Sequence, residues 1–479
     1  MFLWNQLTMT DTASPVMTIN GAPAATEAMF GVINPATGDV FAQAPECTRE
    51  QLDVAMQSAA TAFRTWCRDE GARRALLGSC SDAINAHADE LARMLTLEQG
   101  KPLAKAAGEI AGAAKWFTYT ARLEIPVEVA LDNDRVRVEV RRRPYGVVAA
   151  ITPWNYPVSL AVWKIAPALL AGNTIVLKPS PFTPLATLRL GEILREVLPA
   201  GVLNVVSGGD ALGAWMTSHP SVRKISFTGS VATGKLVAAA AAPDLKRVTL
   251  ELGGNDPAIV LPDVDVAPMA KRLFWGAFEN CGQVCSAIKR VYVPESLYEP
   301  MVAHLTEIAQ GVTVGNGLDE DSQLGPINNQ PQFERVQELV EDARQSGARV
   351  ATGGQRVGDR GYFYAPTIVA DLTDGTRLVD EEQFGPVLPV VSYTDVEDAI
   401  ASANATHFGL SGSVWSSDHV RAEEVARRLE CGTAWVNQHL NVLPHAPFGG
   451  AKWSGIGVEN GPWGLLGFTE IQTLNVAKG

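Results

Sequence analysis

The strongest constraint on the fold is an alternation of apolar strands and amphipathic helices that begins at residue 147. Val147–Ile151 is an uninterrupted apolar run of strand length, Ser159–Leu170 has helical spacing, and Thr174–Leu177 is again a short apolar strand. Strands that are buried on both faces and separated by helices form parallel, doubly wound sheets. The pattern continues with a helix at Pro184–Leu198 and strands at Leu203–Val206, Lys224–Phe227 and Arg247–Leu250. The sequence therefore predicts an α/β fold.

The alternation restarts after Gly253 and Gly254, which indicates a second α/β domain with a boundary near residue 252. Its candidate strands are Ala258–Leu261, Arg290–Val293, Val387–Val391, Gly412–Trp415 and Thr433–Val436. A chain of 479 residues, 46% of them hydrophobic, is long enough for two or three hydrophobic cores. A charged fraction of 19% is typical of a globular protein rather than of a disordered or membrane-spanning one.

The chain before residue 147 has a different pattern. Helices are predicted at Glu50–Arg68, at about 71–98 and at 102–120, and a hairpin around Asn34–Gly38. Over 123–143, polar and apolar residues alternate on both sides of a central turn, which predicts a second hairpin with one apolar face. Such a hairpin cannot stand alone in water, so it packs either on its own domain or on another subunit.

Charge and cysteine usage exclude several functions. The net charge is −13 and Arg141–Arg143 is the only dense basic run, which argues against binding to nucleic acid. The six cysteines lack the spacing of a disulfide framework, and no His or further Cys beside Cys281 and Cys285 completes a zinc site. We therefore expect a reducing compartment, the cytoplasm, with no metal and no membrane partner.

The first residues are expected to form a loose tail. Residues 1–30 are small, polar and aperiodic, and no Lys or Arg precedes Arg49. A secretory signal needs a basic start and an apolar run, so none is expected. Met9 or Met17 could equally be the natural start, which leaves open whether residues 1–16 belong to the natural protein.

The chemistry concentrates in the stretch Asn280-Cys281-Gly282-Gln283-Val284-Cys285-Ser286-Ala287. A cysteine thiolate is the strongest side-chain nucleophile near neutral pH, although a lone cysteine is more often a small buried hydrophobe. Together with Glu251-Leu252-Gly253-Gly254 upstream, the pattern Asn-x-Gly-Gln-x-Cys-x-Ala resembles that of the aldehyde dehydrogenase superfamily. The resemblance extends from about Val32 to the end of the chain.

The resemblance implies two doubly wound parallel-sheet domains and a β-hairpin oligomerisation arm. The dinucleotide-binding domain would comprise residues 1–122 and 144–252, and the catalytic domain residues 253–458. The arm would comprise 123–143 and 459–479, with Phe468–Val476 returning to it as a strand. The resemblance thus favours a hairpin that pairs with a neighbouring subunit, in a homodimer or homotetramer.

The resemblance also assigns three catalytic roles. Cys285 would attack the aldehyde carbonyl, while Asn155 and the Cys285 backbone N–H would stabilise the oxyanion. Taken alone, Asn155 in Pro153-Trp154-Asn155-Tyr156-Pro157 fits an ordinary Asx turn. Glu251 would activate water to hydrolyse the thioester, although alone it could be part of a structural ion pair. Relatives that pass the acyl group to coenzyme A usually lack this base, so hydrolysis is favoured over that alternative.

A nicotinamide dinucleotide is the implied cofactor. Phe227-Thr228-Gly229-Ser230 follows a strand and opens a helix, where glycine lets the backbone approach a pyrophosphate. By resemblance, Lys178 contacts the adenine-side ribose and Glu382 the nicotinamide-side ribose. Many NAD-preferring members have a glutamate where this chain has Pro181, so we expect NAD with measurable use of NADP. The predicted cofactor-binding residues are Thr152, Pro153, Trp154, Lys178, Ser180, Pro181, Gly229, Ser230, Leu252, Glu382 and Phe384.

The expected substrate is a medium-sized hydrophobic aldehyde, aromatic or terpenoid-like. The segments that line the substrate tunnel in the family supply mostly apolar side chains here, whereas a semialdehyde would need Arg or Lys for its far carboxylate. In those segments only Lys164 is basic, and it should point elsewhere on its helix. Semialdehyde oxidation is the alternative. The predicted pocket residues are Tyr156, Leu160, Trp163, Glu279, Val284, Leu440, Val442 and Leu443.

Two further features complete the predicted tunnel. Glu279 could repel an anion near its mouth. His439 and His445 flank a loop that ends in Pro-Phe-Gly-Gly, and they are expected to be entrance or turn residues rather than catalysts.

Overall fold

The computed structural model describes residues 15–478 and contains an eight-stranded sheet at its centre. Its parallel strands confirm the predicted α/β class: β7 (Val147–Ile151), β8 (Thr174–Lys178), β9 (Leu203–Val205), β10 (Val222–Thr228) and β11 (Arg247–Glu251). Antiparallel strands complete the edges: β1 (Met17–Ile19), β2 (Ala22–Ala24) and β19 (Gly455–Ile456). The sheet order is β19-β11-β10-β7-β8-β9-β1-β2. The parallel strands begin in its middle with β7, continue to β8 and β9 on one side and then to β10 and β11 on the other, as in doubly wound folds.

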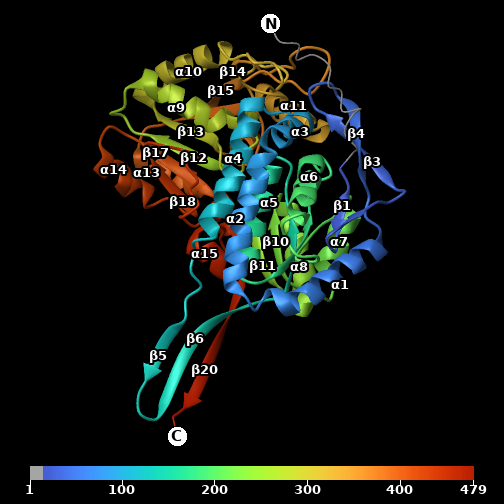
Figure 1. Cartoon of the computed structure of the whole chain (residues 1–479). Coiled ribbons are helices and arrows are strands. Elements are labelled where there is room, and N and C mark those ends of the chain that lie inside the picture. The colour runs from blue at the N-terminus through green and yellow to red at the C-terminus, as the bar shows by residue number, and fades with distance from the viewer. Residues whose placement is uncertain (1–14, 479) are drawn as a thin grey trace.

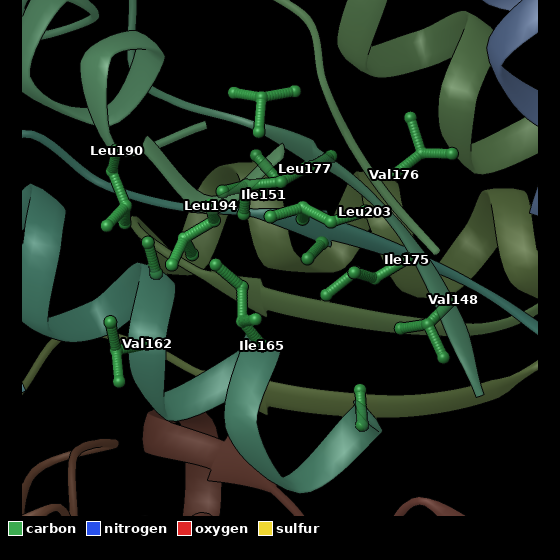
Figure 2. Close-up of a cluster of buried hydrophobic side chains, with 14 of the residues drawn as sticks. Val148, Ile151, Val162, Ile165, Ile175, Val176, Leu177, Leu190, Leu194 and Leu203 are labelled. Atoms are coloured by element: carbon green, nitrogen blue, oxygen red, sulfur yellow. The ribbon is translucent and has the colours of Figure 1, made fainter. Parts of the chain in front are cut away.

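Aliphatic side chains from strands and helices pack into the core of this sheet. Figure 2 shows Val162 and Ile165 of α5 (Pro157–Leu170) among side chains of β7, β8 and α6 (Leu185–Arg195). Both α5 side chains are fully buried, and each such burial stabilises the fold by about 1.5–3 kcal/mol. Pro157 occupies the first turn of α5, where its fixed φ favours helix entry. Two more helices belong to this half: α7 (Asp210–Ser218) and α8 (Val231–Ala241).

Four helices precede the parallel strands: α1 (Arg49–Trp66), α2 (Glu70–Ala86), α3 (Ala88–Gln99) and α4 (Leu103–Thr120). The prediction of a single helix over 71–98 is wrong. His87 has φ −116° and ψ 19°, which is outside the helical region, so α2 ends before this residue and α3 begins after it. No Gly or Pro lies at this break, so the sequence does not show where α2 ends.

The prediction of a loose tail over residues 1–30 is wrong where the structure describes it. Met17 is fully buried in β1, which pairs with β9 through Thr18 and Val205. A hairpin follows, as predicted around its turn, from β3 (Met29–Asn34) and β4 (Asp39–Pro45). Strand pairing uses the backbone, so a segment of small residues can complete a sheet edge without a strong apolar pattern. Residues 1–14 lie outside the described residues.

A seven-stranded sheet forms the second half. In spatial order its strands are β14 (Arg349–Thr352), β15 (Thr367–Leu372), β16 (Val387–Tyr393), β13 (Ile288–Pro294), β12 (Asp256–Val260), β17 (Ser411–Trp415) and β18 (Thr433–Val436). β14 is antiparallel and the other strands are parallel. The sequence did not predict β14 or β15, which end the sheet. The helices of this half are α9 (Val266–Phe278), α10 (Glu295–Gln310), α11 (Gln330–Gln345), α12 (Arg377–Asp380), α13 (Val396–Asn404) and α14 (His419–Ala426).

A third, antiparallel sheet projects from the body of the molecule (Figure 1). It contains β5 (Glu128–Asp132), β6 (Val136–Pro144) and β20 (Thr469–Ala477), and β20 follows the short helix α15 (Gly461–Leu466). β20 pairs with β6 along its whole length, which agrees with the predicted hairpin and the predicted return of the C-terminal strand. Several apolar side chains of this sheet and the residue before it are exposed: Val127, Val129, Leu131, Ile471, Leu474 and Val476.

Among residues 15–478, no helix combines the length and the hydropathy needed to cross a lipid bilayer. Over the same range, no three His, Cys, Asp or Glu side chains gather into a potential metal site.

Candidate active site

Cys285 lies in the loop that connects α9 to β13, an inner strand of the second sheet. The start of this loop has a left-handed backbone, with φ of 51° at Asn280, 59° at Cys281 and 72° at Gly282. A Cβ at Gly282 would lie 2.1 Å from the Gly385 carbonyl oxygen, so the packing requires glycine. The loop places Cys285 on the lining of two cavities, one of about 730 Å³ and one of about 220 Å³.

The other cysteine of the motif has a different environment. Cys281 is only 2% exposed and packs in the hydrophobic core with Ile259 and Val387. Burial raises the pKa of the Cys281 thiol to about 12. Cys281 lines neither cavity and therefore lacks the access that a nucleophile needs.

His439 fixes the loop after the nucleophile. Its Nε2 lies 2.7 Å from the Ser286 carbonyl oxygen, so Nε2 is the protonated nitrogen and donates. Its Nδ1 then accepts from the Ser413 hydroxyl at 2.9 Å. Burial lowers the pKa of His439 to about 3, so the ring is neutral over the working pH range. His439 lines the large cavity, but as a neutral anchor of the nucleophile loop.

Glu251 ends β11 and lines the small cavity beside Cys285. It is 1% exposed, and within residues 15–478 neither carboxylate oxygen has a hydrogen-bond partner. Burial raises the pKa of Glu251 to about 8, and the charge of Glu459 adds to this; Lys164 and the Cys285 thiol act in the opposite direction. A carboxylate with that pKa is a stronger base than an exposed one and is free to bind a proton.

The pKa of the Cys285 thiol is also raised well above its usual value. Burial is the largest cause and the Glu251 carboxylate the next, while Lys289 opposes them. The thiol is therefore neutral at rest and needs a base to become a nucleophile.

Asn155 follows β7 and lines both cavities. One hydrogen of its side-chain amide is donated to the Gln283 carbonyl at 3.0 Å, in the nucleophile loop. An amide carries two such hydrogens, so the second remains for a substrate oxygen. The Asn155 backbone carbonyl accepts from Lys101 Nζ at 2.8 Å and from Asn280 Nδ2 at 3.1 Å. The structure thus brings Cys285, Glu251 and Asn155 together.

Lys101 and Glu109 support this arrangement, and the sequence did not reveal them. The Lys101 ammonium is buried, lies 2.6 Å from Glu109 Oε2 and stands 3.7 Å from the centre of the Tyr156 ring. Glu109 Oε1 in turn accepts from the backbone N–H groups of Val158 and Ser159, at the start of α5. In the sequence, Lys101 appeared only as part of the break between two helices.

The small cavity has the features of a dinucleotide site. Its lining includes seven of the predicted cofactor-binding residues: Pro153, Trp154, Gly229, Ser230, Leu252, Glu382 and Phe384. A Cβ at Gly229 would lie 2.6 Å from Phe227, and a Cβ at Gly253 would lie 2.1 Å from Glu382 Oε2. Glycine thus keeps this wall open, and Ser230 caps α8, whose N-terminus favours an anion. Gln332 and Arg335 of α11 also line the cavity and were not predicted.

The other predicted cofactor residues lie at the ends of neighbouring strands, outside this lining. Thr152 follows β7 and its N–H donates to the Lys178 carbonyl at 3.0 Å, while Ser180 and Pro181 follow β8. The Lys178 ammonium is buried and donates to the Pro179 carbonyl at 3.2 Å. Burial lowers the pKa of Lys178 to about 8. These carboxyl ends of parallel strands are where ligands of doubly wound sheets bind.

The large cavity contains seven of the eight predicted pocket residues: Tyr156, Leu160, Trp163, Glu279, Val284, Leu440 and Val442. Leu443 does not line it and is 37% exposed. Three tryptophans that the sequence did not indicate complete the walls, together with Phe448 of the Pro-Phe-Gly-Gly motif: Trp116, Trp275 and Trp415. Trp163 stacks on Trp116 with 5.4 Å between ring centres and meets the edge of Phe448 at 5.9 Å. Gly108, Gly112 and Trp116 of α4 recur every four residues, a spacing that could have revealed this face.

Two basic side chains also line the large cavity, in segments where the sequence predicted no pocket residue. Lys105 Nζ is 2.8 Å from Glu279 Oε2, so Glu279 is neutralised and does not present a free negative charge. Arg272 donates to the Asn437 carbonyl and covers the Trp415 ring at 5.2 Å. Lys164 points away from the cavity, as predicted, toward Thr228 at 2.7 Å and Glu459.

The chain matches known proteins over nearly its whole length. The sequence model of the aldehyde dehydrogenase family matches residues 22–474. A betaine aldehyde dehydrogenase of Cereibacter sphaeroides is 41% identical over 471 residues, which are 96% of this chain and 97% of that protein. A phenylacetaldehyde dehydrogenase of Pseudomonas fluorescens is 40% identical over 465 residues, covering 94% and 92%. The NAD+ complex of an aldehyde dehydrogenase from Bacillus cereus superposes with a TM-score of 0.95 at 37% identity, covering 97% of each chain. The chain therefore belongs to the aldehyde dehydrogenase family.

Proposed function

We propose that this enzyme oxidises a hydrophobic aldehyde to its carboxylic acid with NAD, through a thiohemiacetal and a thioester on Cys285. The observation that carries the proposal is the position of Cys285 and Asn155, which line both the aromatic cavity and the cavity with dinucleotide features. When the reacting carbon is bound to Cys285, the rest of the aldehyde would extend into the aromatic cavity and the hydride acceptor would lie in the other cavity. The buried base Glu251 lines the second cavity beside them.

The first half of the reaction uses the two raised pKa values. Glu251 takes the proton of the Cys285 thiol, and the sulfur attacks the carbonyl carbon to form a C–S bond. The carbonyl oxygen becomes an oxyanion, which the free Asn155 amide hydrogen and the Cys285 backbone N–H stabilise. One such donor is worth about 3–4 kcal/mol in comparable sites. When bound, the oxidised dinucleotide supplies the acceptor for the hydride that leaves the carbon, and a thioester remains on Cys285.

Hydrolysis completes the cycle. Glu251, after losing the thiol proton, takes a proton from water, whose oxygen attacks the thioester carbon. The C–S bond breaks, the carboxylic acid leaves and the Cys285 sulfur recovers a proton. The proposal favours water over coenzyme A as acceptor because Glu251 is present, buried and free of hydrogen bonds within the described residues.

The proposed cofactor is NAD, with measurable use of NADP. The Bacillus cereus relative was determined as an NAD+ complex, and the residues of the small cavity fit a dinucleotide. Gly229 and Ser230 would hold the phosphates, Glu382 the nicotinamide-side ribose and Lys178 the adenine-side ribose. Pro181 neither accepts hydrogen bonds from a ribose diol nor repels a 2′-phosphate, so selection against NADP would be weak.

The substrate is proposed to be aromatic or terpenoid-like. Four tryptophans, Tyr156 and Phe448 line the large cavity, and its volume of about 730 Å³ suits a medium-sized molecule. Relatives are named for both phenylacetaldehyde and betaine aldehyde. The alternative, a semialdehyde, carries its carboxylate at the end away from Cys285 and would need a free basic side chain there. Of the two on the lining of the large cavity, Arg272 already donates to the Asn437 carbonyl. Lys105 is already paired with Glu279.

A panel of aldehydes with NAD tests the proposal. It contains acetaldehyde, hexanal, phenylacetaldehyde, cinnamaldehyde, betaine aldehyde and succinate semialdehyde, each with and without coenzyme A. Each CH2 that the cavity buries should raise kcat/KM about fourfold, from about 0.8 kcal/mol of transfer energy. We expect phenylacetaldehyde or cinnamaldehyde to have the highest kcat/KM, and coenzyme A to have no effect. A short, cationic or carboxylated aldehyde as the best substrate would contradict the proposed class.

The projecting sheet is proposed to pair with a second copy of the chain. Its exposed apolar residues include Ile471, which is 61% exposed. Ile471→Asp should shift the enzyme to a smaller species in sedimentation velocity. Val420→Asp, on α14 and 70% exposed, is the matched control and should leave the size unchanged. A wild-type monomer, or an unchanged Ile471→Asp oligomer, would show that this face is not the interface.

A further inference from the structure

Lys289 is a buried cation four residues after the nucleophile. It is the second residue of β13 and is 1% exposed. A buried ammonium is costly unless it is paired and fully hydrogen-bonded. A strand inside a parallel sheet normally carries apolar residues at such positions, so the contacts of Lys289 require an explanation.

The Lys289 ammonium binds the backbone of the nucleophile loop. Its Nζ donates to the Val284 carbonyl at 2.8 Å and to the Cys285 carbonyl at 3.0 Å. These two carbonyls are adjacent in the chain, and one ammonium group gathers both. Lys289 therefore holds the two peptide groups that flank the Cα atom of Cys285. His439 holds the next carbonyl, that of Ser286.

The same ammonium faces the small cavity through Glu382. Glu382 Oε1 lies 3.4 Å from Lys289 Nζ and accepts from the Gly254 N–H at 3.1 Å. The Phe384 ring centre is 5.6 Å from Nζ. Gln383, between these residues, donates its amide to the Lys289 carbonyl at 2.7 Å. The segment 382–384 is thus joined to Lys289 by its side chain and by its backbone.

We propose that Lys289 is a positioning residue that couples the two sites, because its single ammonium holds both the backbone of Cys285 and the carboxylate of Glu382. The inference rests on the proposed roles of Cys285 and Glu382. A ligand that binds the Glu382 carboxylate competes with the Lys289 ammonium for it. The ammonium can then bind the Val284 and Cys285 carbonyls more or less tightly, which alters the position of the nucleophile loop. Cofactor binding and thiol reactivity would then depend on each other.

The charges around the nucleophile set the expected direction. The groups that act on the Cys285 thiol are Glu251, Lys289, Asp256 and Glu382, and of these only Lys289 favours the thiolate. The neutral ring of His439 adds no charge. Removing the ammonium should therefore make the thiol less reactive, and neutralising Glu382 should make it more reactive. If Lys289 transmits the influence of Glu382, the second effect should shrink when Lys289 is absent.

The test measures thiol alkylation and dinucleotide binding without any aldehyde. Iodoacetamide modifies Cys285 in the cofactor-free enzyme between pH 6 and 9.5, with the Cys285→Ala variant giving the background. The variants are Lys289→Met, which keeps the length of the side chain, Glu382→Gln and the double variant. NAD affinity is measured separately by quenching of tryptophan fluorescence.

We expect Lys289→Met to slow alkylation at pH 8 by about tenfold, which corresponds to a shift of about one pH unit. Glu382→Gln should speed alkylation in the wild-type background and have a clearly smaller effect in the Lys289→Met background. Lys289→Met should also weaken NAD binding. Equal effects of Glu382→Gln in both backgrounds, or unchanged alkylation in Lys289→Met, would overturn the coupling.

Two measurements keep the result interpretable. If Lys289→Met does not fold, as judged by its thermal melting curve, Lys289→Gln retains amide donors and replaces it in the same cycle. Turnover with the aldehyde panel tests the proposed function separately. An active enzyme whose alkylation rates are additive refutes the coupling alone, whereas an enzyme inactive with every aldehyde refutes the proposed function.

Discussion

Replacing Glu251 by Gln should separate oxidation from hydrolysis. Gln keeps the volume of the side chain but cannot take a proton, so deacylation loses its general base, which contributes about 10²–10⁴-fold in comparable enzymes. Glu251 also takes the proton of the Cys285 thiol, but its charge raises the pKa of that thiol. Gln removes this charge, so at pH 9 solvent hydroxide can deprotonate the thiol and hydride transfer continues. The variant should therefore release about one equivalent of reduced cofactor per site and then stall.

The pH dependence of the wild-type enzyme follows from the environment of Glu251. Burial raises its pKa to about 8, and only the deprotonated carboxylate acts as a base. About one tenth of the carboxylate is ionised at pH 7 and about nine tenths at pH 9, so the rate of deacylation should rise about tenfold over this interval. Stopped-flow absorbance of the reduced nicotinamide measures the burst and the steady state separately.

Three results would refute this reasoning about Glu251. A Glu251→Gln variant without a burst at pH 9 would show that the Cys285 thiol cannot be activated without Glu251, even when hydroxide is available. A variant with wild-type steady-state turnover would remove it from the mechanism. A wild-type deacylation rate that falls as the pH rises from 7 to 9 would show that the protonated carboxyl is the active form.

Further predictions concern single residues. Cys285→Ala should abolish turnover while NAD still binds in a fluorescence titration, whereas Cys281→Ala should keep most of the activity; the reverse pattern would contradict the assignment. Pro181→Glu should lower kcat/KM for NADP by at least about tenfold through like-charge repulsion and leave that for NAD nearly unchanged; strong NADP preference in the wild type would contradict the cofactor proposal. Lys101→Met, which removes one of the two donors to the Asn155 carbonyl, should lower kcat about 10–100-fold with little change in KM; an effect on KM alone would deny it a positioning role. Trp163→Ala should lower kcat/KM for phenylacetaldehyde about tenfold more than for acetaldehyde; equal losses would move the substrate tail elsewhere.

The sequence predicted what short-range patterns encode. The strands from β7 to β11 are mostly runs of buried residues with turn signals at their ends, and their alternation with helices predicted a parallel sheet. Cys285, Glu251 and Asn155 each lie in a compact motif at a strand end or loop, so the resemblance of these motifs to those of a family was enough to propose their roles.

Residues that act through distant contacts were not predictable in this way. Glu109 reaches the start of α5, and its partner Lys101 reaches the Asn155 carbonyl, because α4 packs on α5; Trp116 enters the cavity from α4 as well. Lys289 stands just before the predicted strand Arg290–Val293, and nothing near it in sequence indicates Glu382. The pairing of β1 with β9 likewise depends on a contact between segments far apart in the chain. Neither this pairing nor the helix break at His87 leaves a local signal in the sequence.

The most direct test of the account is the mass of the covalent intermediate. Glu251→Gln is mixed with phenylacetaldehyde and NAD at pH 9, quenched in acid after the burst, and analysed by intact-protein and peptide mass spectrometry. The expected protein is heavier by the mass of the aldehyde minus two hydrogens, one lost as a hydride and one as a proton. The acyl group should lie on Cys285 in the peptide that contains it, and hydroxylamine should release it. An unmodified protein after a full burst, or an acyl group on Cys281, would contradict it.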